Sequence, residues 1–246
     1  MLSTPPVADR PVALRIGLIA LATDHTSERD YARMIPPGQV GVYVNRIAYE
    51  NPTNRENLLR MQPHLKEAAA MILPGERLDA LVFSCTAASV EIGDELVHNA
   101  LQAAKPDATT VTPISSAMAA FETLGIKRLG LLTPYTPEVT ENMARYFAQQ
   151  GLEIVHQSCF GLEDDRVMAR VEPEAIVQAA VETDHSSVQG LFISCTGLRA
   201  AEVAQQIEER IGKPVVTSNQ STVWQSLRLA GYGEPVSGYG RLLMEH

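Results

Sequence analysis

The chain has 246 residues, 45% of them hydrophobic and 20% charged, and its formal net charge is −9 at pH 7. This length suits one large or two small globular domains with a well-buried core. An acidic chain whose Lys and Arg residues are scattered singly lacks the electrostatic footprint of proteins that bind nucleic acid or a membrane surface.

Short apolar runs alternate with longer amphipathic ones along the chain, which is the pattern of an α/β protein. Most of the short runs are almost continuously apolar, as expected for parallel strands that helices cover on both faces. The predicted strands are residues 13–21, 40–47, 78–84, 109–114, 128–134, 152–158, 188–194 and 213–218.

Several helix boundaries are also readable. Thr53 and Glu56 stand at the spacing of a capping box, and Pro63 is expected to split the helix that follows. Two further helices are predicted over residues 86–104 and 196–210, each beginning directly after a cysteine.

Cysteine and histidine spacing gives no sign of a metal site or a disulfide framework, because neither C-x-x-C nor H-x-x-x-H occurs. The first dozen residues form a Pro-rich lead-in without the apolar segment of a signal peptide. No run approaches the roughly 20 apolar residues of a membrane span. We therefore expect a cytoplasmic protein without a bound metal.

The two halves of the chain repeat each other. Three pairs of similar segments occur in the same order, and they are RIGLI and RLGLL from Arg15 and Arg128, SCT around Cys85 and Cys195, and VTPISS and VTSNQS from Val111 and Val216. Such self-similarity predicts a duplicated α/β unit. We expect two Rossmann-like (flavodoxin-like) lobes with parallel sheets, related by a pseudo-twofold axis, with the active site between them. The N-terminal lobe would comprise residues 1–113 plus 224–246, and the C-terminal lobe residues 114–223.

Each S-C-T triplet follows a predicted strand, at the edge where open α/β sheets bind ligands. A helix N-terminus after each cysteine would stabilise the thiolate and offer backbone N–H groups to a carboxylate or an enolate oxygen. The candidate donors are Thr86, Ala87, Thr196 and Gly197. Thr217, Ser218 and Asn219 occupy the equivalent place after the last strand, and we expect them near the cleft.

Two thiols on opposite sides of a planar carbon suit two reactions. One thiolate can remove an α-proton while the other thiol returns one, which is racemisation. Alternatively, a thiolate adds to an activated double bond, the adduct rotates, and elimination gives the other geometric isomer. Neither route needs a metal, flavin, nicotinamide or pyridoxal group, and the sequence carries no motif for such a cofactor.

The segments GLIALATDHTSERDYARMIP, YENPTNRENLLRMQPHL, FSCTAASVEIGDE and SGYGRLL resemble the aspartate/glutamate racemase superfamily. The likeness is to the branch that holds maleate cis–trans isomerases and arylmalonate decarboxylases, and above all to racemase-like proteins of ectoine utilisation. The resemblance implies that Cys85 is the nucleophile or first base and Cys195 its acid/base partner. It implies that Tyr135 contacts a substrate carboxylate. Decarboxylases of this branch keep only the second cysteine, so isomerisation or racemisation is favoured.

The resemblance also exposes two departures. Maleate isomerases have an asparagine where this chain has Asp24, and a second family asparagine falls at Asp165. An ionised aspartate repels a carboxylate, so a substrate with a cationic or amide-bearing end is expected, such as a 2,4-diaminobutyrate derivative from ectoine breakdown. The alternative is that Asp24 caps the helix that follows it.

Together these observations predict a cofactor-independent two-cysteine isomerase or racemase that acts on a small carboxylate. Maleate-like isomerisation and amino-acid racemisation remain open, and so does assembly into a homo-oligomer. The rival functions are a two-lobed small-carboxylate binding or sensing protein without turnover, and an arylmalonate-type decarboxylase.

Overall fold

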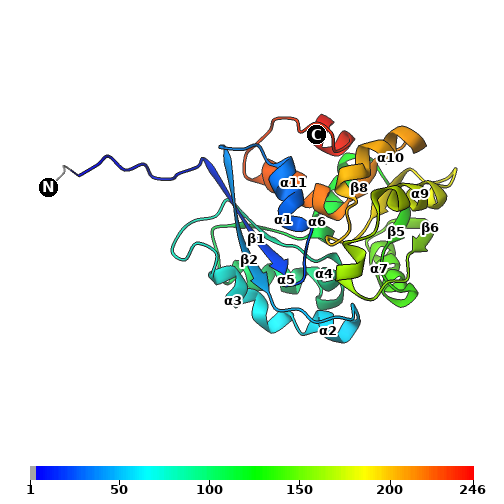
Figure 1. Cartoon of the computed structure of the whole chain (residues 1–246), viewed down its shortest axis with the longest axis horizontal. Helices are drawn as coiled ribbons and strands as arrows, with labels where there is room; N and C mark the ends of the chain where they lie inside the picture. Colours follow the sequence, from blue (N-terminus) through cyan, green and yellow to red (C-terminus); the bar gives the residue numbers. More distant parts are fainter. Residues whose placement is uncertain (1–3) are drawn as a thin grey trace.

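The computed structural model describes residues 4–246 as two parallel four-stranded sheets, one in each half of the molecule (Figure 1). The strand order is β2-β1-β3-β4 in the first sheet and β6-β5-β7-β8 in the second. The strands are β1 Leu14–Leu21, β2 Val40–Ile47, β3 Ala80–Phe83, β4 Thr109–Val111, β5 Arg128–Thr133, β6 Glu153–Cys159, β7 Gly190–Ile193 and β8 Val215–Thr217. All eight predicted strands are confirmed, and the identical strand order confirms the duplicated unit.

Packing explains why the same glycine recurs in RIGLI and RLGLL. Gly17 of β1 pairs in register with Leu81 of β3, and Gly130 of β5 pairs with Leu191 of β7. A Cβ on Gly17 would lie 2.9 Å from the Leu81 side chain, and one on Gly130 would collide with Leu191. Glycine therefore occurs at both positions because the neighbouring leucine leaves no room for a Cβ in either sheet.

Helices cover both sheets, and no helix within residues 4–246 has the length and apolar character needed to cross a bilayer. The helices are α1 Ser27–Met34, α2 Arg55–Leu59, α3 Leu65–Ala70, α4 Thr86–Ile92, α5 Asp94–Gln102, α6 Pro113–Thr123, α7 Pro137–Gln149, α8 Asp165–Met168, α9 Pro173–Thr183, α10 Ala204–Ile211, α11 Ser218–Leu229 and α12 Arg241–Glu245, with 3₁₀ turns η1 Gln62–His64 and η2 Ala201–Val203. The proline at position 63 lies in η1 and separates α2 from α3, as predicted.

Three helix predictions need correction. The helix predicted over residues 86–104 breaks into α4 and α5 at Gly93, whose φ of 98° lies outside the helical range. Residues 196–200 form turns, and regular α-helix begins only with α10, because side chains of other elements occupy the Thr196 carbonyl. The cap of α2 is Asn54, which accepts a bond of 2.9 Å from the Asn57 N–H, and not Thr53.

Helix α11 brings the two halves of the fold together. It packs against α1, α6, β3 and β4 of the first half and against β8 of the second. Figure 1 shows it in orange beside the blue α1. The predicted lobe boundaries at residues 113 and 223 fall at the start of α6 and inside α11, and these boundaries remain a prediction.

The contact between α1 and α11 buries a carboxyl group. Asp30 is 2% exposed, and its Oδ2 accepts a hydrogen bond of 2.8 Å from the Asn219 amide. Burial raises the pKa of Asp30 from 3.8 to about 6, although the Asn219 bond opposes the shift. The ionised form is therefore disfavoured in the folded state. The resulting loss of folding stability is absent below pH 3.8 and complete above pH 6.

Replacing Asp30 with asparagine should remove this cost. The free energy of unfolding of Asp30→Asn should exceed that of the wild type, and the excess should depend on pH. We expect it to be about 2 kcal/mol larger at neutral pH than near pH 4.5. Urea unfolding of both proteins at the two pH values measures this difference. A stability difference that does not change with pH would contradict the raised pKa of Asp30.

Candidate active site

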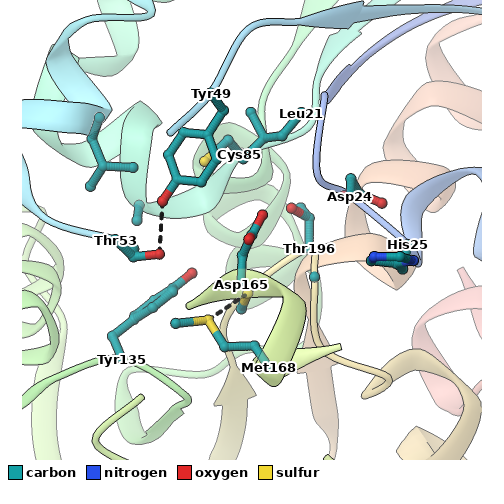
Figure 2. Close-up of a pocket in the computed structure, with 14 residues that line it drawn as sticks. Leu21, Asp24, His25, Tyr49, Thr53, Cys85, Tyr135, Asp165, Met168 and Thr196 are labelled. Atoms are coloured by element: carbon teal, nitrogen blue, oxygen red, sulfur yellow. Dashed lines mark hydrogen bonds between the residues drawn. The ribbon is translucent and has the colours of Figure 1, made fainter. Parts of the chain in front are cut away.

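Both repeated cysteines line one small pocket between the two sheets (Figure 2). Of the residues predicted to bind substrate, all but Thr86 line it. The lining residues are Leu21, Asp24, His25, Tyr49, Thr53, Leu58, Cys85, Ala87, Tyr135, Asp165, Met168, Cys195, Thr196 and Gly197.

Sequence reasoning missed part of this lining. Tyr49 and Thr53 lie after β2, and their hydroxyl groups are hydrogen-bonded at 2.8 Å. Met168 ends α8, one turn after Asp165, and its sulfur lies 4.0 Å from the Cys195 sulfur. Tyr49 and Thr53 could have been predicted from the sequence, because they follow a predicted parallel strand and loops at that edge of a sheet contact the ligand.

The threonines of the two S-C-T triplets connect the halves of the protein. The Thr86 hydroxyl donates to the Ser218 hydroxyl at 2.8 Å, and the Thr196 hydroxyl donates to the Ser84 carbonyl at 3.1 Å. The Thr86 hydroxyl is thus engaged with α11, which explains why this residue does not line the pocket. Each triplet is therefore hydrogen-bonded to an element beyond its own strand. The cysteine between the serine and the threonine lines the pocket.

The serines of the triplets reach toward neighbouring loops. Ser84 shares a hydrogen bond of 2.8 Å with Ser27, and Ser194 donates to the Tyr135 hydroxyl at 3.4 Å. Because Tyr135 accepts from Ser194, its own proton is free to face Cys195.

Burial dominates the acidity of the two thiols. Cys85 is 6% and Cys195 8% exposed. Desolvation raises the pKa of the Cys85 thiol far above its usual value and that of Cys195 to about 12. Burial thus outweighs the expected stabilisation by a helix N-terminus, and α-helix does not follow Cys195 directly. The thiolate form of both cysteines is disfavoured by this desolvation.

The two thiols nevertheless have different neighbours. The Tyr135 hydroxyl and the Gly197 N–H oppose the rise in the pKa of Cys195, whereas the Ala88 N–H alone does so for Cys85. Since two donors can bond to its sulfur, Cys195 holds a negative charge more readily than Cys85.

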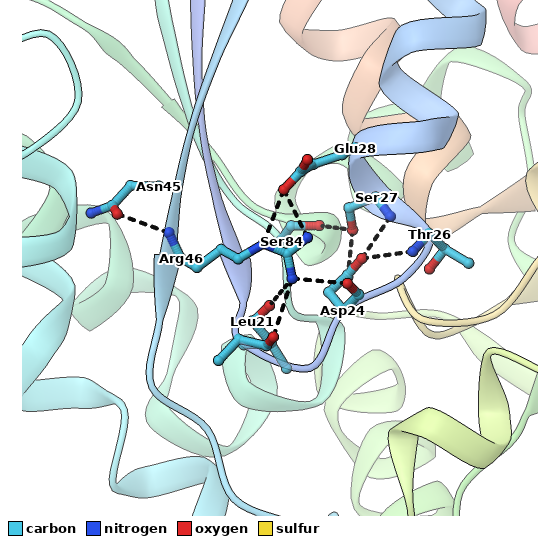
Figure 3. A network of polar contacts seen from close by, with 9 residues as sticks. Leu21, Asp24, Thr26, Ser27, Glu28, Asn45, Arg46 and Ser84 are labelled. Carbon is cyan, nitrogen blue, oxygen red and sulfur yellow. Dashed lines mark hydrogen bonds and ion pairs between the residues drawn. The ribbon is translucent and has the colours of Figure 1, made fainter.

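Asp24 lines the pocket but uses its carboxylate to begin α1 (Figure 3). Its Oδ1 accepts from the N–H groups of Thr26 and Ser27 at 2.8 and 2.7 Å. Its Oδ2 accepts from the Ser27 hydroxyl at 2.7 Å, and Arg46 reaches only its backbone carbonyl. The geometry thus supports the helix-cap alternative for Asp24. Burial raises the pKa of this carboxyl group.

Asp165 joins the two halves over one side of the pocket. Its carboxylate accepts from the Asn51 amide at 2.6 Å and from the Thr23 hydroxyl. Its own N–H donates to the Asn51 side-chain oxygen at 3.0 Å, and the Thr53 N–H donates to the Glu163 carbonyl at 2.6 Å. These bonds hold the carboxylate at the pocket wall, where Figure 2 shows it pointing inward.

The charge of the pocket is unusual for a site that would receive two carboxylates. Asp24 and Asp165 both line it, and none of the described lining residues is Lys or Arg. His25, on the exposed rim, is the one lining side chain that can become cationic. The described lining therefore supplies two carboxyl groups and no permanently charged side-chain cation.

Comparison with known proteins places the chain in a family. The sequence profile described as arylmalonate decarboxylase matches residues 67–243. The chain belongs to the arylmalonate decarboxylase family. It is 24% identical over 245 residues to a maleate isomerase from Alcaligenes faecalis, covering 93% of this chain and 96% of that protein. It is 34% identical over 125 residues to the arylmalonate decarboxylase of Bordetella bronchiseptica, covering 50% of this chain and 52% of that one.

The fold agrees with that of solved structures of this family. A Nocardia farcinica maleate cis–trans isomerase variant, solved with a covalently bound succinylcysteine intermediate, superimposes with a TM-score of 0.86. The two chains are 19% identical, and the match covers 95% of this chain and 99% of that one. The likeness confirms the two-lobed α/β fold that the repeat predicted.

Neutralising Asp24 should make both cysteines more reactive. Its negative charge raises the pKa of Cys85 and of Cys195, and an asparagine can keep the bonds to Thr26 and Ser27. Asp24→Asn should therefore speed iodoacetamide labelling of both thiols near neutral pH. The gain is about threefold for each unit by which a thiol pKa falls, because the thiolate fraction rises while the nucleophilicity of each thiolate declines.

The labelling rates are measured for each cysteine by mass spectrometry of its peptide. Asp164→Asn is the matched control, because Asp164 caps α8 next to the pocket residue Asp165 without lining the pocket itself. Unchanged or slower labelling in Asp24→Asn would show that its charge does not act on the thiols.

Proposed function

We propose that this member of the family is a cofactor-independent isomerase in which Cys85 and Cys195 serve opposite faces of a carbon next to a substrate carboxylate. The observation that carries the proposal is the convergence of the two thiols. They follow equivalent strands, β3 and β7, and line one pocket, where they are 6% and 8% exposed.

Amino-acid racemisation is the reaction that the charges favour. In one direction a thiolate takes the α-proton, which leaves a planar carbanion, and the opposite thiol donates its proton to the other face. The negative charge has then moved from one sulfur to the other, and no redox partner is needed. In the reverse direction the two cysteines exchange roles.

The pocket also restricts the substrate. In this proposal the backbone N–H of Ala87 binds a single carboxylate beside the reacting carbon, while the N–H of Gly197 faces the Cys195 sulfur. Asp165, and to a smaller extent the helix-capping Asp24, disfavour a second carboxylate and attract an ammonium or amide group. A small amino acid with a basic or amide-bearing side chain fits, such as a 2,4-diaminobutyrate derivative from ectoine breakdown.

Maleate isomerisation is the second candidate, because the likeness to maleate isomerases spans nearly the whole chain. Here a thiolate adds to one alkene carbon while the opposite thiol protonates the other. The new single bond rotates, and loss of that proton with release of the thiolate gives fumarate. This reaction requires the pocket to accept two carboxylates beside Asp165.

Proton NMR in D₂O separates the two candidates. The reduced protein is incubated with aspartate, glutamate, 2,4-diaminobutyrate, its two mono-acetyl forms and maleate, in parallel with Cys85→Ser and Cys195→Ser. We expect the α-proton signal of a diaminobutyrate-type amino acid to disappear with the wild type and to persist with both variants.

Each outcome has a clear meaning. Conversion of maleate to fumarate would replace racemisation with the second candidate. Proton exchange that survives both serine substitutions would remove the cysteines from the mechanism. Silence with every compound, together with slow and equal labelling of both thiols, would favour a binding protein over an enzyme.

Substitution of Asp165 tests whether its charge selects against a second carboxylate on the substrate. Asp165→Asn keeps an oxygen for the Asn51 amide but removes the negative charge, so binding of a dicarboxylate should improve. We expect the KM for maleate, or its inhibition constant if it does not react, to fall by about tenfold, the equivalent of one pKa unit of interaction. Asp164→Asn again serves as the control, and equal constants in both variants would refute a role for Asp165 in charge selection.

A further inference from the structure

The two equivalent cysteines differ in their backbone. Cys85 has the extended conformation, with φ −153°, whereas Cys195 has φ 96°. Within residues 4–246, Leu73 is the other non-glycine residue with a positive φ. A residue with a Cβ is strained in this region and stays there only when its surroundings hold it.

Three hydrogen bonds hold the backbone around Cys195, one at its own N–H and two at the carbonyl of the following residue. The Cys195 N–H donates to the Ser218 hydroxyl at 3.1 Å. The Thr196 carbonyl accepts from the Asn219 amide at 2.8 Å and from the Thr26 hydroxyl at 2.6 Å. Two of the three come from the first turn of α11, so this helix end determines the direction of the Cys195 backbone.

The Asn219 amide is itself oriented by Asp30. Its Nδ2 faces two acceptors, the Thr196 carbonyl and the Asp30 carboxylate, each at 2.8 Å, so the nitrogen and oxygen of this amide cannot be exchanged. Both side chains are 2% exposed. The Asn219 Oδ1 is buried and has no hydrogen-bond partner in the described part of the chain. An unpaired buried oxygen costs free energy, so the two bonds on Nδ2 decide the orientation of the Asn219 amide.

We propose that Asn219, oriented by Asp30, is a positioning residue that keeps Cys195 in its left-handed backbone conformation and thereby aims its thiol into the pocket. Asn219 and Asp30 do not line the pocket, so they act through Cys195 and do not touch substrate. The kinetic part of this proposal rests on the proposed function, whereas its structural part does not.

Cysteine labelling with ¹³C tests the structural part directly. The chain contains three cysteines, so the spectrum of the full-length protein has three Cα signals, which Cys→Ser variants assign. The Cα shift reports backbone conformation. Asn219→Leu, which keeps the branched shape but removes both donors, should shift the Cys195 signal and leave those of Cys85 and Cys159 in place.

Two more variants guard against a general loss of structure. Asp30→Asn keeps an acceptor for the Asn219 amide, so it should give a smaller shift of the same signal. Glu208→Gln is the matched control. Glu208 is also a buried carboxyl group, and it accepts hydrogen bonds from the Val215 and Arg241 N–H groups at a site outside the pocket. This substitution should leave the Cys195 signal unchanged.

With an active substrate in hand, kinetics adds an independent measurement. Asn219→Leu should lower kcat by about 100-fold, the effect of a misplacement of about 1 Å, with little change in KM. An unmoved Cys195 signal in folded Asn219→Leu and in Asp30→Asn would overturn the proposal. A moved signal without activity on any compound would leave the positioning role intact and count against the proposed function instead.

Discussion

The rest of the structure depends on one constraint, the hydrogen bonds that link each S-C-T triplet to the opposite half of the protein. The Thr86 hydroxyl reaches Ser218 of α11, and the Thr196 hydroxyl reaches the Ser84 carbonyl. All four residues are almost fully buried, so these bonds form where water cannot replace them. They bring two strand ends that are far apart in the sequence to one pocket, each with its thiol exposed to the same small volume.

That placement has an electrostatic consequence. Because the thiols are deeply buried and two carboxylates lie nearby, the pKa of both thiols is raised, and a thiolate needs help from hydrogen-bond donors around the sulfur. Such help is unequal, since Tyr135 and Gly197 both face Cys195. A buried thiol is protected from adventitious oxidation and alkylation, because the thiolate is the reactive form and burial disfavours it.

Buried carboxyl groups around the pocket perform separate tasks. Asp24 begins α1 with three hydrogen bonds, Asp165 joins the two halves at the pocket wall, and Asp30 orients an amide behind Cys195. Each raises the cost of folding to some degree, because a charge is removed from water. Two of them, Asp24 and Asp165, line the pocket, whose described lining contains no Lys or Arg.

The sequence by itself determined the eight strands, the duplication, the two cysteines and most of the pocket residues. It could do so because buried parallel strands leave continuous apolar runs, and because ligand sites lie directly after them. Only the tertiary structure decided that Thr86 faces α11, that Tyr49 and Met168 join the pocket, and that Cys195 adopts φ 96°. It also showed that burial outweighs the nearby N–H groups in setting the pKa of both thiols. Hydrogen-bond partners and desolvation depend on residues more than a hundred positions away, and local sequence patterns carry no information about such neighbours.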